Sequence, residues 1–155
     1  MNNYESLLID YENCEIDFKE VDFQCNKEIG YYNNNKILVN TQISNKQKYG
    51  VLAEELGHHF TTVGDIKKLD NTNNKKQELK ARRWGHKKIV SLDSIIEAFD
   101  NNCLNKYEIA EYLGVTDKYF EECIQDYKNM YGTEVCKIGK YHIIFEPSLG
   151  IYQKF

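Results

Sequence analysis

Apolar and polar residues follow two different periods along the chain, which separate predicted helices from predicted strands. Apolar positions recur at helical spacing over residues 4–11. Alternation of period two over residues 16–23 indicates short strands, and residues 30–40 predict two strands joined by an Asn-rich turn. The first quarter of the chain is therefore predicted to be a helix followed by a small sheet.

Helical periodicity continues through the middle of the chain. Two long helices are predicted over residues 46–62 and 75–90, and the polar residues 70–74 between them predict a loop. A third helix is predicted from Ser91, because apolar residues follow it at helical spacing. The middle of the chain is thus predicted to be helical.

The last third predicts a second helical segment and a final hairpin. Residues 105–128 are typical of two helices separated by a tight turn at Gly114, with Thr116 as the cap of the second helix. Residues 135–145 predict a β-hairpin. We expect an α+β fold in one compact domain over residues 1–155.

The most informative segment is the first of the two long helices, residues 46–62. At about 100° per residue, Leu52 and Leu56 lie in one apolar arc, while Glu54, Glu55 and His58 gather on the opposite side. His59 borders the apolar arc, so we interpret it as a structural residue. The helix therefore has one packing face and one face that carries two carboxylates and an imidazole.

This spacing is that of a metal-binding helix. Glu54 and His58 are one turn apart, so both side chains can reach one ion, and Glu55 is offset enough to reach a water on that ion. The HExxH zinc helix has this geometry, with its Glu as general base and a histidine where this chain has Glu54. The alternative interpretation is a solvated acidic face with one exposed histidine.

The second long helix, residues 75–90, offers a third ligand. Glu78 falls in the middle of the stripe that contains Ala81 and Gly85, and these small residues would let the two helices pack closely. A buried carboxylate needs a partner, which could be a metal ion shared with His58 or a salt bridge to a flanking Lys or Arg. The metal interpretation makes Glu54, His58 and Glu78 the ligands.

These motifs together resemble the ImmA/IrrE family of metallopeptidases of prophages and mobile elements. The resemblance covers the strands at residues 30–40, the segment 52–59, the Glu78-x-x-Ala81-x-x-Trp84 helix and residues 107–116. It implies a zincin-like fold, with a core at residues 1–90 that contains the small N-terminal sheet and two metal-site helices. Residues 91–155 would form a helical, helix-turn-helix-like subdomain that ends in the hairpin.

The resemblance also implies a function. It predicts a cytoplasmic, metal-dependent endopeptidase that hydrolyses a peptide bond in a regulatory protein, namely a helix-turn-helix repressor. By position, Glu55 would be the catalytic glutamate, His58 the second motif histidine and Glu78 the acidic ligand. Glu54 stands where the fuller motif has histidine.

The glutamate at position 54 changes the expected metal chemistry. Two carboxylates and one imidazole cancel the charge of a divalent ion, so it polarises a carbonyl less than a site with two histidines. Oxygen ligands also favour harder ions. We therefore expect one divalent ion, Zn²⁺ in the first place and Mn²⁺ as the alternative. A non-catalytic module that sequesters a repressor through a degenerate site is the alternative function.

Composition and charge restrict the partners. The chain has 155 residues, 20 Lys and Arg against 24 Asp and Glu, and a formal net charge of −4. The helix predicted after Thr116 is acidic, which disfavours direct binding to nucleic acid. No apolar run approaches the roughly 18–20 residues of a membrane span, and five cysteines without a CxxC pair do not indicate a thiolate zinc site. The sequence does not predict an oligomeric state.

Overall fold

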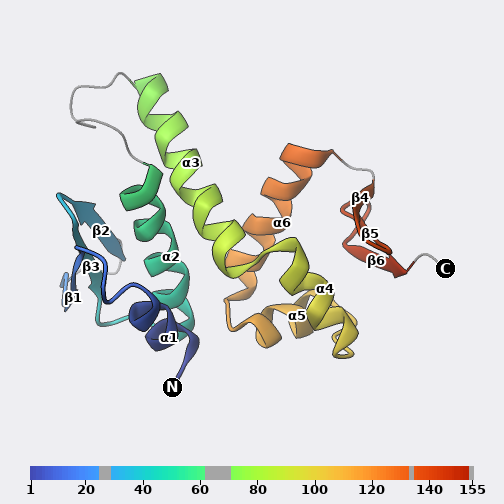
Figure 1. Ribbon diagram of the computed structural model, residues 1–155, viewed down its shortest axis with the longest axis horizontal. Coiled ribbons are helices and arrows are strands. Elements are labelled where there is room, and N and C mark those ends of the chain that lie inside the picture. Colours follow the sequence, from blue (N-terminus) through green and yellow to red (C-terminus); the bar gives the residue numbers. More distant parts are fainter. Residues whose placement is uncertain (25–28, 62–70, 133–134, 154–155) are drawn as a thin grey trace. The chain divides into compact units, whose positions relative to one another are not determined.

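The computed structural model describes residues 1–24, 29–61, 71–132 and 135–153 (Figure 1). They form an α+β fold, as predicted, in two compact units that comprise residues 1–88 and 89–155. The elements are α1 (Asn3–Asp10), β1 (Asp17–Val21), β2 (Gly30–Asn33), β3 (Lys36–Asn40), α2 (Asn45–Thr61), α3 (Asn71–Ile89), α4 (Leu92–Asp100), α5 (Lys106–Leu113), α6 (Asp117–Tyr131), β4 (Val135–Ile138), β5 (Tyr141–Ile144) and β6 (Gly150–Gln153).

The first unit contains a three-stranded sheet of order β1-β3-β2. β3 pairs with β1 in parallel and with β2 in antiparallel orientation. The predicted Asn-rich turn is confirmed, because Asn34 and Asn35 connect β2 to β3 with φ of 45° and 61°. Left-handed φ at both central residues is the requirement of a two-residue hairpin turn, and asparagine tolerates it better than other side chains.

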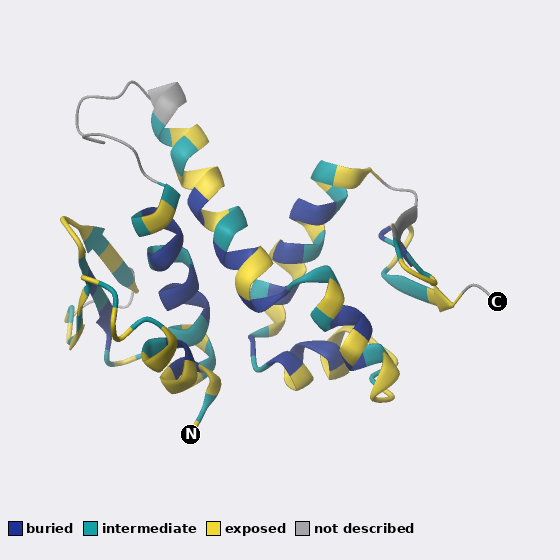
Figure 2. Cartoon of the chain, in the orientation of Figure 1, coloured by how far each residue is buried: buried dark blue, intermediate teal, exposed yellow. Residues whose placement is uncertain are grey.

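Helix α2 lies between the sheet and α3 and forms the centre of this unit (Figure 1). Its apolar arc is buried, with Leu52, Ala53 and Leu56 fully inaccessible (Figure 2). Ile37 and Val39 of β3 are buried, and α2 packs against both β2 and β3. Helix α1 packs on α2 as well. The predicted packing face of α2 is thereby confirmed at Leu52 and Leu56.

Helices α2 and α3 approach each other closely through small residues, as the sequence predicted. A Cβ atom on Gly57 would overlap the carbonyl oxygen of Ala81 and would lie 2.8 Å from its carbonyl carbon. A Cβ atom on Gly85 would lie 3.0 Å from the carbonyl carbon of Ala53. The two contacts are one helical turn apart on each helix and run in opposite order, so the helices cross antiparallel with their backbones in contact.

One predicted loop is wrong. Residues 71–74 were expected to connect the two long helices, yet α3 already begins at Asn71; Asp70 lies outside the described residues. Asn and Thr have only modest helix penalties, and each residue added to an existing helix gains a backbone hydrogen bond. A long helix can therefore extend over a polar segment that propensity alone assigns to a loop.

The second unit contains the predicted helices, and the predicted cap at Thr116 is confirmed. Ser91 caps α4 through Ser94 N–H, and Thr116 caps α6 through Tyr119 N–H. Gly114 ends α5 with a left-handed φ of 74°. The Tyr127 hydroxyl of α6 donates to the carbonyl of Val90, which ties α6 to the start of this unit.

The C-terminal sheet is larger than predicted. β4 and β5 form the expected hairpin, and β6 adds an antiparallel third strand to β5. β6 was not predicted from the sequence, because the strand is defined by its pairing with β5 rather than by a local pattern.

The glycine contacts between α2 and α3 lead to a graded stability prediction. Gly57→Ala places a methyl group against backbone that cannot rotate away, which costs about 1–3 kcal/mol of overpacking and outweighs the roughly 1 kcal/mol gained in helix propensity. Gly85→Ala should lower the free energy of unfolding less, because its contacts are 3.0–3.2 Å. Urea unfolding followed by circular dichroism measures both.

Lys80→Ala on the exposed side of α3 is the control and should stay within about 0.5 kcal/mol of the wild type. If Gly57→Ala were as stable as the wild type or more stable, this result would contradict the close contact between α2 and α3.

Candidate metal centre

Three predicted ligands meet in the first unit. One ligand atom each from Glu54, His58 and Glu78 lies within 4.8 Å of the others. His58 Nε2 and Glu78 Oε2 are 3.4 Å apart. The residues come from two helices and are separated by up to 24 positions in the sequence, so tertiary packing is what brings them together.

The glycine contacts explain why these side chains converge. His58 follows Gly57 directly, and Glu78 precedes Ala81 by three residues, on the same side of α3. Glu54 stands one turn before His58 on α2. Because the two backbones touch at Gly57 and Ala81, the carboxylate of Glu78 can reach the imidazole of His58.

The position of Glu78 differs from the prediction. The wheel put Glu78 in the middle of the packing stripe of α3, whereas its side chain keeps 52% of its surface exposed. Ala81 and Gly85 are buried, and Glu78 lies at the edge of the stripe. The spacing of residues gives the direction of each side chain around one helix. The packing of the neighbouring helix determines which of those side chains are buried. Glu78 therefore closes the cluster from the solvent side.

The face of α2 that carries the polar cluster is not a solvated surface. His58 is only 8% exposed, and Glu54 and Glu55 are half-buried. The cause is that β2 and α3 flank this face of α2, through Gly30 of β2 on one side and Ala81 of α3 on the other. The interpretation of residues 54–58 as an exposed acidic face is thereby wrong.

Glu55 lies beside the three ligands and against the first residue of β2. A Cβ atom on Gly30 would lie 2.8 Å from Glu55 Oε1 and would overlap Val51, so only glycine leaves room for this carboxyl. Burial, followed by the charges of Glu54 and Glu78, raises the pKa of Glu55 to about 8. The carboxyl thus holds its proton at neutral pH unless a positive charge enters the cluster.

Two further residues border the cluster. The Tyr32 ring of β2 is nearly parallel to the His58 imidazole, with 6.5 Å between ring centroids. Its hydroxyl oxygen lies 3.0 Å from His59 Nδ1. No role for Tyr32 was predicted from the sequence, although its place on the same strand face as Gly30 follows from the alternation of β2. His59, interpreted as structural, is half-buried in this contact.

The donor set fits a divalent cation. Tetrahedral ligands at about 2.1 Å from one ion stand about 3.4 Å apart, which is the separation of His58 Nε2 and Glu78 Oε2. Two carboxylates and one imidazole are ligands that zinc and harder ions both accept. The pKa of Glu55 is raised first by burial and then by the charges of Glu54 and Glu78, and a cation here would offset that charge repulsion.

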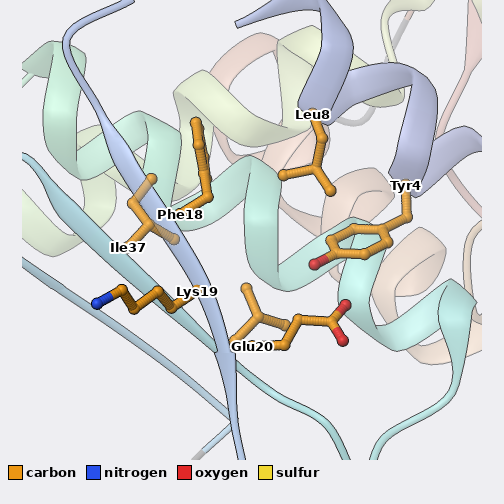
Figure 3. A pocket seen from close by; sticks show the side chains of 7 residues that line it. Tyr4, Leu8, Phe18, Lys19, Glu20 and Ile37 are labelled. Atoms are coloured by element: carbon orange, nitrogen blue, oxygen red, sulfur yellow. The ribbon is translucent and has the colours of Figure 1, made fainter. Parts of the chain in front are cut away.

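A separate cavity of about 150 Å³ lies elsewhere in the first unit and does not include the cluster. Its walls come from α1, β1 and β3, and Figure 3 shows the Tyr4 hydroxyl pointing toward the Glu20 carboxylate. Lys48 Nζ also binds Glu20, at 3.2 Å. The polar groups at this cavity thus bind one another, and we assign the cavity no part in the metal centre.

Comparison with known proteins gives no family for this chain. No protein-family model matches it, and no curated protein matches it. Among the described residues, no helix is long and apolar enough to cross a membrane. The assignment of a function therefore depends on the geometry of the cluster.

The raised pKa of Glu55 predicts how pH changes the stability of the metal-free protein. A carboxyl whose pKa is higher in the folded than in the unfolded chain stabilises the fold below pH 4.5, and this contribution is lost as pH rises through about 8. Glu55→Gln should therefore be more stable than the wild type at pH 8, with a difference that shrinks toward pH 4.5. Urea unfolding in chelator across this range measures the difference.

Glu12→Gln removes one exposed charge away from the cluster and serves as the matched control. If the difference in unfolding free energy between Glu55→Gln and the wild type did not depend on pH, the ionised carboxyl of Glu55 would not be destabilised by its surroundings.

Proposed function

We propose that this protein is a metal-dependent endopeptidase with a zincin-like core in residues 1–88. The observation that carries the proposal is the convergence of Glu54, His58 and Glu78 from two helices, with the carboxyl of Glu55 beside them. Three ligands plus one adjacent carboxyl are the parts that metal-assisted hydrolysis needs. The resemblance of these residues to the ImmA/IrrE motifs supports the same proposal.

Each residue has a distinct role in this proposal. Glu54, His58 and Glu78 hold the ion, which when bound supplies Lewis-acid activation of water and of a carbonyl oxygen. Glu55 accepts the proton of the attacking water and delivers it to the leaving amine. The ion's positive charge favours the ionised form of Glu55, which is the form that can accept a proton.

The substrate in this proposal is a regulatory protein of the helix-turn-helix repressor class, on the basis of the family resemblance. Direct binding to DNA is disfavoured by α6, which follows the turn at Gly114 and exposes Asp117, Glu121 and Glu122. Glu121 forms an ion pair with Lys106 Nζ at 2.7 Å, and the carboxylates of Asp117 and Glu122 repel phosphates.

A second candidate function is sequestration of the repressor without cleavage. The observation that favours it is Glu54, since a second carboxylate ligand weakens the polarisation of water and carbonyl by the ion. In that case the cluster would bind metal as a structural element.

Metal binding is the first test of the cluster. The protein should be purified without added metal and its metal content measured by elemental mass spectrometry. We expect close to one divalent ion per chain. Single alanine substitutions of Glu54, His58 or Glu78 should lower the affinity at least tenfold, because each removes a ligand. Glu12→Ala should bind like the wild type.

Replacement of Glu54 by histidine tests the choice of ion. Glu54→His produces two imidazoles and one carboxylate, so the ratio of zinc affinity to manganese affinity should rise at least tenfold. Competition titrations with both ions measure the ratio. An unchanged ratio would show that residue 54 is not a ligand.

Catalysis is tested with the zinc- and manganese-loaded protein and a helix-turn-helix repressor encoded next to it. The wild type should cleave the repressor, and Glu55→Gln should lose at least 100-fold in rate while it keeps its metal. Cleavage by neither protein, together with stable binding of the repressor by both, would favour sequestration over hydrolysis.

A further inference from the structure

Tyr32 faces α2 from the neighbouring strand. In β2, Gly30 and Tyr32 are half-buried while Tyr31 and Asn33 are exposed, so alternate residues face α2 and solvent. Gly30 lies against Glu55, and Tyr32 lies farther along the strand, beside His58. The strand therefore runs along the cluster and places the Tyr32 side chain beside His58.

The hydroxyl of Tyr32 is held by a polar neighbour that is not a metal ligand. Its oxygen is 3.0 Å from His59 Nδ1, and it can also donate to Asn35 Oδ1 at the longer distance of 3.4 Å. The edge of the His59 ring packs on Tyr32 and on Phe60, which fixes the imidazole in place. When His59 donates from Nδ1, the hydroxyl proton of Tyr32 remains available for another acceptor.

Charge shows why this phenol matters for the proposed reaction. Attack of water on a peptide carbonyl places negative charge on its oxygen, and a preorganised donor lowers the barrier at that point. Glu54, Glu55 and Glu78 are carboxyl groups, which accept hydrogen bonds and repel an anion when ionised. A neutral O–H donor next to them can bind an oxyanion without adding charge. Tyr32 is such a donor, and its ring lies parallel to that of His58 with 6.5 Å between the ring centroids.

We propose that Tyr32 is a catalytic residue whose hydroxyl donates a hydrogen bond to the oxyanion of the substrate, and that His59 is its positioning residue. The inference rests on the proposed function, because it requires an ion held by Glu54, His58 and Glu78. On carbonyl attack, the hydroxyl turns from Asn35 to the anionic oxygen while His59 keeps the phenol oriented.

The test uses the full chain loaded with Co²⁺, whose visible spectrum reports its ligands, and inorganic phosphate as a tetrahedral oxyanion. Phosphate should change the cobalt spectrum of the wild type. Tyr32→Phe should keep the Co²⁺ affinity and the spectrum of the free site but bind phosphate about 10- to 100-fold more weakly, because it lacks one hydrogen bond to a charged group.

Two further variants separate a donor from a packing residue. Tyr31→Phe removes a hydroxyl from the exposed side of the same strand and should bind phosphate like the wild type. His59→Phe should weaken phosphate binding, and His59→Gln, which retains a donor, should restore part of the loss. Thermal unfolding of each variant verifies that it is folded.

The outcomes separate this inference from the proposed function. If Co²⁺ does not bind the wild type, the proposed function fails, and the role of Tyr32 fails with it. If Co²⁺ binds but phosphate leaves the wild-type spectrum unchanged, or binds Tyr32→Phe equally well, the role of Tyr32 is overturned while the metal centre stands. Loss of Co²⁺ binding in Tyr32→Phe would assign the ring a structural role and also overturn the inference.

Discussion

The backbone contact between α2 and α3 is the constraint on which the candidate site depends. Gly57 meets Ala81 with no room for a Cβ atom, and Gly85 meets Ala53, where a Cβ atom would be tightly packed. This contact places the residues that flank it, His58 and Glu78, 3.4 Å apart at their polar atoms. A larger side chain at the crossing would move the two helices apart and would therefore also separate His58 from Glu78.

The same packing brings like charges together. Glu55 lies against Gly30 of β2, and burial, followed by the charges of Glu54 and Glu78, raises its pKa to about 8. Burial and repulsion of this kind destabilise a fold, and they cluster at sites with a chemical role. A cation would convert the repulsion into attraction, so metal binding and folding are expected to be coupled in residues 1–88.

Much of the secondary structure and part of the site could be predicted from local patterns. The wheel for residues 46–62 grouped Glu54, Glu55 and His58 because one helix fixes their relative directions. It could not give their burial, since His58 is covered by neighbouring elements rather than by its own helix. Contacts between distant segments decide three further features. They are the exposure of Glu78, the formation of strand β6 and the position of Tyr32 beside His58.

Local patterns predicted most of the helices and strands, the cap at Thr116, and the small residues Ala81 and Gly85 that permit two helices to touch. These features are local, because they depend on the spacing and the shape of neighbouring side chains. Contacts between distant segments bring the three candidate ligand residues together, bury the carboxyl of Glu55 near them and place the Tyr32 ring parallel to that of His58. Distances between segments are set by packing, which the linear pattern does not contain.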